Sequence, residues 1–538
     1  MPDAVVVGAG HNGLVAANLL ADRGWEVAVL EEQDEVGGAV RTAELVEPGF
    51  RNDMFSAFYP LAAASPVLRG LELERHGLEW RRAHTVFTHP TRDGDGAAVT
   101  LDPDETAASL EAFAPGDGDG WRRLYGLWQR IGDELVDALF SPFPPIAAGA
   151  RLAARLRGRD LVRFLRFALL PVRRVADETF SGAGGGLLLA GNTLHSDLTP
   201  ESAGGGLYGW LLTCLGQERG FPAPRGGAGE LTQALARRLI ARGGRIECGS
   251  RVDRIVVRGG RAAAARTADG REVEADRAIL ASVSAPALYL GLLPREEVPA
   301  HVLDDVRRFE WDTGTFKVDW TLDAPVPWEH EPSRSAATVH VADDMDAMTE
   351  HAAHVQMQRV SARPFLVTGQ YASFDLDRAP EGKATFWAYT HVPGRPRGDA
   401  AGELSGDWGE ADAELFADRV EREVEARAPG FRELIRGRNV ATPQALERGD
   451  ANLVAGAINN GTAQIHQQLV FRPLPGLGRP ETPIKDLYLA SAAAHPGGGV
   501  HGAPGANAAR AALRARRTAR RVIDLGRRAP RLTGRERA

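Results

Sequence analysis

The 538-residue sequence predicts an α/β fold with a parallel sheet assembled from distant parts of the chain. Apolar runs of strand length stand at 4–7, 276–281 and 486–491. The first leads through a glycine-rich turn into a helix-forming stretch at 14–21, and another apolar run follows at 27–30. Strands that alternate with helices are typical of a parallel sheet covered by helices. We therefore expect these separated segments to share one domain.

The glycine-rich turn Gly8-Ala9-Gly10-His11-Asn12-Gly13 has the spacing of a dinucleotide-binding βαβ unit. Its glycines allow a tight turn, a close approach to a pyrophosphate, and close packing of the helix on the strand. The start of the helix offers free N–H groups and a positive dipole end to phosphates. Glu31, with Glu32 beside it, ends the second strand, where it can bind both hydroxyls of a ribose. These features predict a Rossmann-like nucleotide site and do not choose between NAD and FAD.

A second glycine pair, Gly37-Gly38, follows that strand and stands close before Arg41. Adjacent glycines beside an arginine can form a second contact for a phosphate. A surface turn with a solvated arginine would leave the same pattern, but the preceding βαβ unit favours the phosphate contact.

Length and composition exclude several classes of protein. The length implies two or more domains. The formal net charge of −7 argues against a nucleic-acid-binding protein. The two cysteines, Cys214 and Cys248, are far apart and form no CxxC pair, so we expect neither a redox-active disulfide nor a metal site. The chain enters the nucleotide motif at once and has no apolar run of about 18 residues, so we expect a cytoplasmic protein without a membrane span.

Two later glycine-rich segments carry a family resemblance. Pro224-Arg225-Gly226-Gly227-Ala228-Gly229 precedes an amphipathic helix, and Ala494-His495-Pro496-Gly497-Gly498-Gly499-Val500 precedes a final helix at 507–521. Together with the N-terminal motifs they resemble the flavoprotein superfamily of phytoene desaturases, carotenoid isomerases and amine oxidases. The resemblance spans essentially the whole chain and implies FAD as the cofactor. Ala494 and His501 depart from the residues common in that family, but neither change removes a backbone donor.

The resemblance also implies which residues hold FAD, since in this superfamily the last glycine loop faces the flavin ring and earlier segments hold the nucleotide. The expected FAD site comprises Gly8, Gly10, His11, Asn12, Gly13, Glu31, Glu32, Gly37, Gly38, Arg41, Gly226, Gly227, Val252, Ala281, Ser491, Gly498, Gly499, Val500 and Ala503.

Two further motifs, Pro48-Gly49-Phe50-Arg51-Asn52-Asp53 and Phe471-Arg472-Pro473, resemble the branch of pyridine nucleotide-disulfide oxidoreductase domain-containing protein 2. A GGNIFHG-like stretch of this branch is replaced here by Gly456-Ala457-Ile458-Asn459-Asn460-Gly461-Thr462. That departure lies near the expected substrate side, so the identity of the substrate does not carry over. Despite the branch's name, Gly182–Gly186 lacks the strand that a second nucleotide motif needs, which disfavours a disulfide reductase.

The predicted domains follow from these segments. Residues 1–75, 215–285 and 480–525 form a discontinuous FAD-binding domain of the glutathione-reductase type. Residues 76–214 form a helical lid or substrate region, and residues 286–479 an inserted α+β substrate domain. Residues 526–538 form a basic tail that we expect to be flexible.

The expected chemistry is hydride transfer from a substrate carbon to N5 of the flavin, because the cofactor carries the difficult step. Lys317 and His495 are the candidate catalytic residues. Lys317 shares a strand face with Asp319, and a strand lysine in related amine oxidases reaches a water near N5. An ordinary ion pair is the simpler explanation of Lys317, and His495 could instead brace the glycine loop. His195 and His466 are weaker candidates.

Four functions remain open from the sequence. They are desaturation or oxidation of an apolar or natural-product-like molecule, redox-neutral isomerisation of a polyene-like molecule, amine oxidation, and flavin binding with little turnover. The expected partners are a lipophilic small molecule and an electron acceptor, either oxygen or a quinone, with the protein a monomer or homodimer.

Arginines recur at three- to four-residue intervals between 151 and 166 and predict one basic helix face. Such a face could lie on an anionic membrane and admit a lipophilic substrate. A solvated lid over the substrate channel would explain the same pattern, and the sequence leaves both alternatives open.

Overall fold

The computed structural model describes residues 1–528. Residues 529–538, most of the predicted basic tail, lie outside the described residues. A five-stranded sheet in the order β21-β13-β1-β2-β9 forms the centre of one domain, and its neighbouring strands are all parallel. Its strands are β1 (Ala4–Val7), β2 (Val27–Leu30), β9 (Arg245–Glu247), β13 (Ala278–Ala281) and β21 (Leu487–Leu489). This sheet confirms the predicted α/β fold class.

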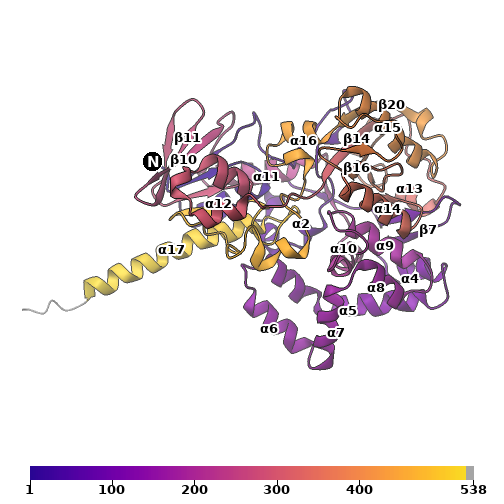
Figure 1. Ribbon diagram of the computed structural model, residues 1–538, viewed down its shortest axis with the longest axis horizontal. Helices are drawn as coiled ribbons and strands as arrows, with labels where there is room; N and C mark the ends of the chain where they lie inside the picture. The colour runs from indigo at the N-terminus through magenta and orange to yellow at the C-terminus, as the bar shows by residue number, and fades with distance from the viewer. Residues whose placement is uncertain (529–538) are drawn as a thin grey trace, which may run out of the picture.

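Both faces of this sheet are covered, which is why its strands read as continuous apolar runs. Val6 and Val29 belong to the core shared with three helices, and Val5 and Ile279 belong to the core shared with Ile255 of a small antiparallel sheet. The helices are α1 (His11–Ala21), α11 (Gly229–Ala241) and α17 (Ala503–Arg528). The small sheet contains β10 (Val252–Arg258), β11 (Arg261–Thr267) and β12 (Glu272–Glu274). Figure 1 shows the resulting layers.

A second, seven-stranded sheet has the order β20-β14-β18-β17-β15-β6-β7. Its strands are β6 (Thr85–Pro90), β7 (Gly96–Thr100), β14 (Gly314–Leu322), β15 (Thr338–Val341), β17 (Leu366–Gln370), β18 (Ala384–Val392) and β20 (Ile435–Ala441). Residues 85–100 were assigned to the helical region from the sequence, whereas the structure adds them to this sheet. The difference arises because β6 pairs in parallel with β15, about 250 residues later, a contact that local sequence does not encode.

Alternation along β14 gives the second sheet two different faces. Phe316 and Trp320 face a core that includes Phe416 of α15 (Glu410–Glu425). Phe316 meets Phe416 edge to face with ring centroids 4.8 Å apart. Thr315 and Lys317, which alternate with Phe316 along the strand, line a cavity on the other face.

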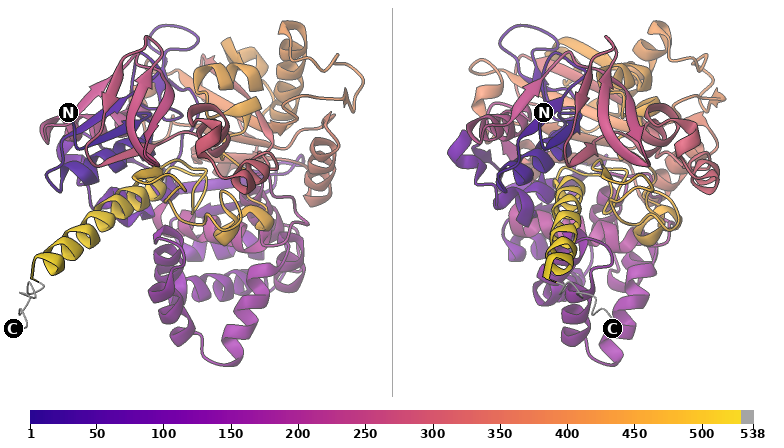
Figure 2. Two further views of the ribbon diagram at one scale, coloured as in Figure 1. Left: turned by 60° about the vertical axis from the view of Figure 1, so that its left-hand side comes forward. Right: turned by 90° about the vertical axis from the view of Figure 1, so that its left-hand side faces the viewer.

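A group of helices projects from the two sheets at the bottom of Figure 1, and Figure 2 shows the same projection from two other sides. It contains α4 (Pro103–Glu111), α5 (Asp117–Phe140), α6 (Ile146–Arg155), α7 (Arg159–Leu169), α8 (Val172–Thr179), α9 (Gly184–Thr193) and α10 (Gly205–Arg219). No helix within residues 1–528 is long and apolar enough to cross a membrane.

The arginine-rich stretch at 151–166 is two helices, α6 and α7, and not one continuous basic face. The break falls at Gly158, whose φ of 56° suits glycine and ends the helical path. Arg151 pairs with Asp137 at 2.8 Å, and Arg166 pairs with Glu178 at 2.6 Å. Part of the positive charge is therefore matched by neighbouring helices.

Candidate functional site

A groove opens where the strands of the parallel sheet end. Gly8 follows β1, Glu31 follows β2, and Ser282 follows β13, and all three line the groove. Ligands of open α/β sheets bind at this edge, outside the carboxyl ends of the strands. Gly8 has a φ of 93°, and a Cβ at Gly13 would overlap the carbonyl oxygen of Gly8. The glycine spacing is thus required by the turn and by the approach of α1 to β1.

Glu31 is fixed at the rim of this groove. One carboxylate oxygen, Oε2, accepts the Ala9 N–H at 2.6 Å, and the other, Oε1, accepts the Gln33 N–H at 3.0 Å. Burial raises the pKa of Glu31. Each carboxylate oxygen can accept a further hydrogen bond, so the side chain is placed to bind two adjacent hydroxyls.

Residues that line the groove carry buried polar atoms without partners. Among the described residues, His11 Nε2, Asn12 Oδ1 and Asn460 Oδ1 are buried and find no hydrogen-bond partner. Burial lowers the pKa of His11 to about 4, so its ring is neutral near pH 7. Buried polar atoms are costly to leave unpaired. A polar ligand in the groove would satisfy these atoms.

A second cavity adjoins the groove, and both linings contain His11, Ala39, Leu453, Ile458 and Ala492. Its lining is mostly aromatic and aliphatic, including Phe55, Phe58, Tyr208, Leu212, Trp387 and Tyr389. The polar part comprises mainly His11, His195, Lys317 and Asn459, and no carboxylate among the described residues lines it. An apolar cavity with few polar groups is typical of a small-molecule site.

The loop 458–462 lies between groove and cavity, with Asn459 lining the cavity and Asn460 lining the groove. Asp312 accepts the N–H groups of Ile458, Asn459 and Gly461 at 2.8, 2.8 and 3.0 Å. Three backbone N–H groups of the loop are therefore bound by one buried carboxylate.

Arg472 binds the opposite, carbonyl side of this loop. It donates to the carbonyl oxygens of Asn459 at 2.9 Å, Asn460 at 3.1 Å and Thr462 at 3.0 Å. It also donates to the Ala492 carbonyl at 2.8 Å, and only 1% of the residue is exposed. One buried guanidinium thus joins this loop to the segment that follows β21. The sequence marked Arg472 as part of a motif without revealing this role.

A family model described as flavin containing amine oxidoreductase matches residues 13–523. The chain belongs to this family. Pyridine nucleotide-disulfide oxidoreductase domain-containing protein 2 of Rattus norvegicus is 29% identical over 552 residues, covering 95% of this chain and 93% of that protein. Phytoene desaturase (lycopene-forming) of Pseudescherichia vulneris is 25% identical over 530 residues, covering 95% and 99%. A solved oxidoreductase from Methanosarcina mazei shares the fold, with a TM-score of 0.60 and 14% identity, covering 95% of this chain and 99% of that one.

Membership in the flavin containing amine oxidoreductase family confirms the predicted superfamily, the FAD cofactor and the enzyme class. The protein is an FAD-dependent oxidoreductase. The groove fits FAD, because it combines a glycine turn at a helix start, an acidic residue after β2 and unpaired polar atoms. Gly8, Gly10, His11, Asn12, Glu31, Glu32, Gly38, Val252 and Ser491 all line it.

Gly37 and Arg41 support the groove from behind. The Gly37 N–H donates to the Ala9 carbonyl at 3.0 Å, which holds the second glycine pair against the first turn. Arg41 is buried, and its guanidinium donates to the carbonyl oxygens of Gly38 at 3.0 Å and Gly449 at 2.6 Å. Arg41 does not line the groove, so its contact with an FAD phosphate stays a prediction.

The residues predicted around the C-terminal glycine loop lie near both the groove and the cavity. Gly499 and Val500 line the cavity, and a Cβ at Gly498 would overlap the side chain of Asn459. Ala281 ends β13 and accepts the Ala490 N–H at 2.8 Å. Ala503 begins α17. The glycine loop therefore connects the groove, the loop 458–462 and the start of α17.

Gly226 and Gly227 do not line the groove. Gly227, with a φ of 141°, packs against Thr42. The Gly226 N–H donates to Asp375 at 3.0 Å, and its carbonyl accepts from Arg51 at 3.2 Å. This turn thus joins the parallel-sheet domain to the seven-stranded-sheet domain. The predicted contact of Gly226 and Gly227 with FAD stays a prediction.

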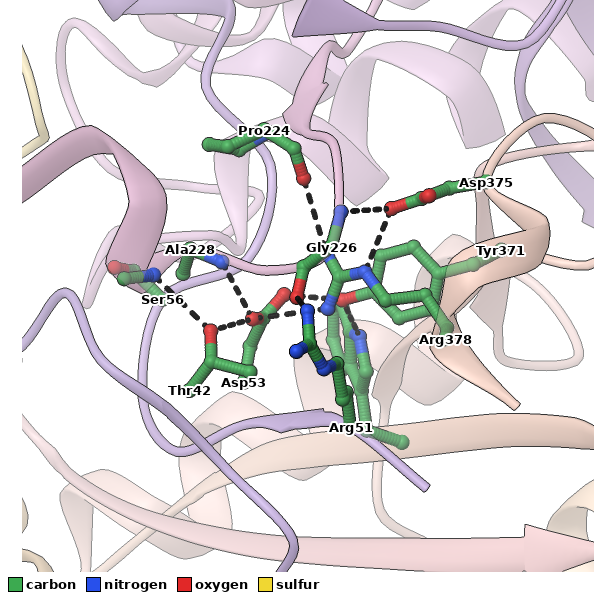
Figure 3. A network of polar contacts seen from close by, with 12 residues as sticks. Thr42, Arg51, Asp53, Ser56, Pro224, Gly226, Ala228, Tyr371, Asp375 and Arg378 are labelled. Carbon is green, nitrogen blue, oxygen red and sulfur yellow. Dashed lines mark hydrogen bonds and ion pairs between the residues drawn. The ribbon is translucent and has the colours of Figure 1, made fainter. Parts of the chain in front are cut away.

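Asp53 lies at the centre of the polar network around that turn (Figure 3). Its Oδ1 accepts the Ala228 N–H at 2.7 Å and pairs with Arg378 at 3.0 Å. Its Oδ2 accepts the Tyr371 hydroxyl at 2.7 Å, and Tyr371 in turn accepts the Trp387 indole N–H at 2.9 Å. Because Trp387 lines the cavity, Asp53 connects the turn to the cavity wall. The sequence identified Asp53 only as part of a family motif.

The two predicted catalytic residues have different positions. Lys317 lines the cavity, where its ammonium pairs with Asp319 and lies 5.9 Å from the Trp387 ring centroid. Burial raises the pKa of Asp319 to about 6, although Lys317 opposes the shift. His495 does not line the cavity; its ring meets Phe143 edge to face at 5.4 Å. Lys317 thus remains a candidate for chemistry, and the position of His495 favours a bracing role.

Of the two weaker histidine candidates, one lines the cavity and the other does not. His195 lines the cavity, and its Nε2 lies 2.7 Å from Nε2 of His340. His466 is exposed and bonds Glu310 at 2.7 Å. No group of three His, Cys, Asp or Glu side chains within residues 1–528 could hold a metal ion.

Replacing Glu31 with alanine should weaken FAD binding by about 1–3 kcal/mol, because the ribose would lose charge-assisted hydrogen bonds. Titration of FAD into the apoprotein, followed by flavin fluorescence, measures the change. Glu26→Ala, at the opposite end of β2 and exposed, is the matched control and should leave the affinity unchanged. Equal FAD affinity in the Glu31→Ala protein would show that Glu31 does not bind the ribose.

Buried histidines should make the protein less stable in acid. Burial lowers the pKa of His89 to about 3, so the unfolded chain is protonated first as the pH falls below about 6.5. The contribution of His89 to the free energy of unfolding is complete above that pH and is lost toward pH 3. Between pH 6 and 4, the wild type should lose about 1.4 kcal/mol per pH unit relative to His89→Gln. Urea unfolding at each pH measures the free energy of unfolding. His84→Gln, at an exposed site, is the control and should show the same pH dependence as the wild type. If the wild type and His89→Gln lose stability equally with falling pH, burial of His89 does not cause the loss.

Proposed function

We propose that this FAD-dependent oxidoreductase dehydrogenates an apolar, natural-product-like small molecule. The observation that carries the proposal is the aromatic and aliphatic cavity beside the FAD groove, where Lys317 is the one charged side chain among the described residues of the lining. FAD, when bound, supplies a hydride acceptor at N5.

The protein's own groups would bind the substrate, orient it and exclude water. Trp387, Tyr389 and Phe58 offer flat apolar surfaces suited to a conjugated or cyclic hydrocarbon. The loop 458–462 stands between this cavity and the groove. Lys317, paired with Asp319, is positioned to hold a water molecule or a substrate proton at its Nζ atom.

The charge of the cavity favours an apolar substrate over an amine. A protonated amine needs a carboxylate or another counter-charge, and no carboxylate among the described residues lines the cavity. Asp319, the nearby acid, is already paired with Lys317. The phytoene desaturase of Pseudescherichia vulneris, by its name, acts on a polyene, which agrees with this preference.

Anaerobic addition of candidate substrates tests the proposal. The panel contains a polyene hydrocarbon, a monoterpene and an alkyl amine of similar length, and the readout is the yellow absorbance of bound FAD. Bleaching by a hydrocarbon with formation of a desaturated product supports the proposal. Bleaching by the amine alone would overturn it in favour of amine oxidation, and product without lasting bleaching would overturn it in favour of isomerisation.

We also propose dioxygen or a quinone as the electron acceptor. Mixing substrate-bleached protein with each acceptor, and following the return of the yellow absorbance, distinguishes them. If neither restores the absorbance faster than buffer alone, this proposal is wrong.

A further inference from the structure

More than half of the large apolar side chains exposed by the described residues lie in two segments. One segment is α6 with α7, and the other contains the short helices Ile465–Gln467 and Leu469–Phe471. We name their exposed members the apolar rim: Ile146, Val162, Leu165, Leu169, Ile465, Leu469, Val470 and Phe471. Exposed apolar side chains gathered in this way mark an interaction surface.

The exposed residues of α7 form one stripe. Val162, Leu165 and Leu169 are spaced by three and four residues, so they lie on the same side of the helix. Val162 is 66% and Leu165 56% exposed, whereas Phe164 on the opposite side is buried. Helix α7 therefore has apolar residues both on the face that packs against the protein and on the face exposed to solvent.

The stripe lies beside arginines, although the whole chain has a net charge of −7. Arg151, Arg155 and Arg166 are paired with Asp137, Glu134 and Glu178 of neighbouring helices at 2.8, 2.8 and 2.6 Å. Residues 146–169 contain a single acid, Asp160, and six arginines: Arg151, Arg155, Arg157, Arg159, Arg163 and Arg166. Arg163 is 64% exposed, and its separation from Asp160 is 3.9 Å, a weak surface pair. An apolar stripe beside exposed arginines complements an anionic lipid surface.

The second segment of the apolar rim lies near the stretch of chain that leads into α6. Phe143, three residues before Ile146, contacts the His495 ring. Arg472, directly after Phe471, donates to the Ala492 carbonyl at 2.8 Å. Both views of Figure 2 show the orange-yellow segment directly above the projecting helices.

One helix separates this surface from the cavity. Phe167 of α7 packs edge to face on Trp210 of α10 at 5.2 Å. Tyr208 and Leu212 of the same helix line the cavity. A lipophilic substrate dissolved in a bilayer would thus stand one helix away from the site that accepts it.

We propose that the apolar rim docks this protein on the surface of an anionic lipid bilayer. Helix α7 lies in the interface, with Val162, Leu165 and Leu169 among the acyl chains and its arginines among the headgroups. The docking is a property of this surface and is independent of turnover.

Vesicle flotation tests the proposal, with phosphatidylglycerol–phosphatidylcholine vesicles and pure phosphatidylcholine vesicles as probes and the FAD-loaded full chain as the sample. The wild type should float with the anionic vesicles, and salt should weaken the binding. Val162→Ser with Leu165→Ser, and separately Val470→Ser with Phe471→Ser, should each lower the bound fraction about tenfold. Arg159→Ala with Arg163→Ala should reduce the preference for anionic vesicles.

The matched control is Met357→Ser with Leu376→Ser, which removes apolar side chains that are 57% and 77% exposed elsewhere and should leave flotation unchanged. Retained FAD absorbance and an unchanged melting temperature show that each variant is folded. The proposal is overturned if the wild type does not float, or if the rim variants float like the wild type. It is also overturned if light scattering shows a wild-type dimer that the rim variants dissociate, since the rim would then join two copies of the chain.

Discussion

Replacing Asp53 with asparagine should lower the free energy of unfolding by about 3 kcal/mol or more, because it removes one partner of a buried ion pair. The Asp53 carboxylate pairs with Arg378 and accepts the Ala228 N–H and the Tyr371 hydroxyl. An asparagine amide lacks the negative charge and can accept through only one of its two end atoms. Urea unfolding, followed by tryptophan fluorescence, measures the loss.

The matched control for Asp53 is Asp377→Asn. Asp377 pairs with Arg225 at 2.5 Å, but both side chains are about half exposed, so this change should cost less than about 1 kcal/mol. If both variants lose the same free energy of unfolding, burial of the Asp53 network does not determine its contribution to stability. Since Asp53 also orients Trp387 through Tyr371, Asp53→Asn should in addition raise KM for the cavity's substrate.

Replacing Arg472 with methionine should lower the free energy of unfolding by about 3–5 kcal/mol and weaken FAD retention. The buried guanidinium donates hydrogen bonds to the carbonyl oxygens of Asn459, Asn460 and Ala492. Methionine fills much of the same space but leaves these acceptors without donors, and each such loss costs about 1–3 kcal/mol. Urea unfolding gives the stability, and FAD released on gel filtration gives the retention.

A conservative variant and a control variant test whether the effect of Arg472→Met comes from its hydrogen bonds. Arg472→Lys keeps the charge but cannot reach several carbonyl groups at once, so it should recover only part of the stability. Arg479→Met, at an exposed arginine, should behave like the wild type. If Arg472→Met retained FAD and full stability, the loop 458–462 would not depend on this guanidinium.

The fold could be predicted largely because its motifs are local. The turn from Gly8 to Gly13 and the acid at Glu31 encode their geometry within 24 residues near the start of the sequence. A Cβ at Gly13 would overlap the Gly8 carbonyl oxygen, and Gly8 has a φ of 93°, which explains these two glycines. The same reasoning failed for residues 85–100, because a parallel strand pair far apart in sequence leaves no local signal.

The parts of the site that the sequence did not predict are held by distant pairs. The Gly226 N–H donates to Asp375, which lies 149 residues later in the chain. Asp53 and Arg378 are about 325 residues apart, and each alone reads as an ordinary charged residue. Lys317 and Asp319 were paired correctly because residues two apart on a strand share a face. Whether Lys317 takes part in catalysis stays a prediction.

The order of strands in the parallel sheet has a consequence for synthesis of the protein on the ribosome. Strand β21, the last to be made, pairs with β13, which itself lies against β1 near the N-terminus. The glycine loop that completes the site follows β21. Chains emerge from N-terminus to C-terminus, so a nascent chain shorter than about 500 residues lacks this edge of the site. We therefore expect newly made protein to acquire FAD only after nearly the whole chain has left the ribosome.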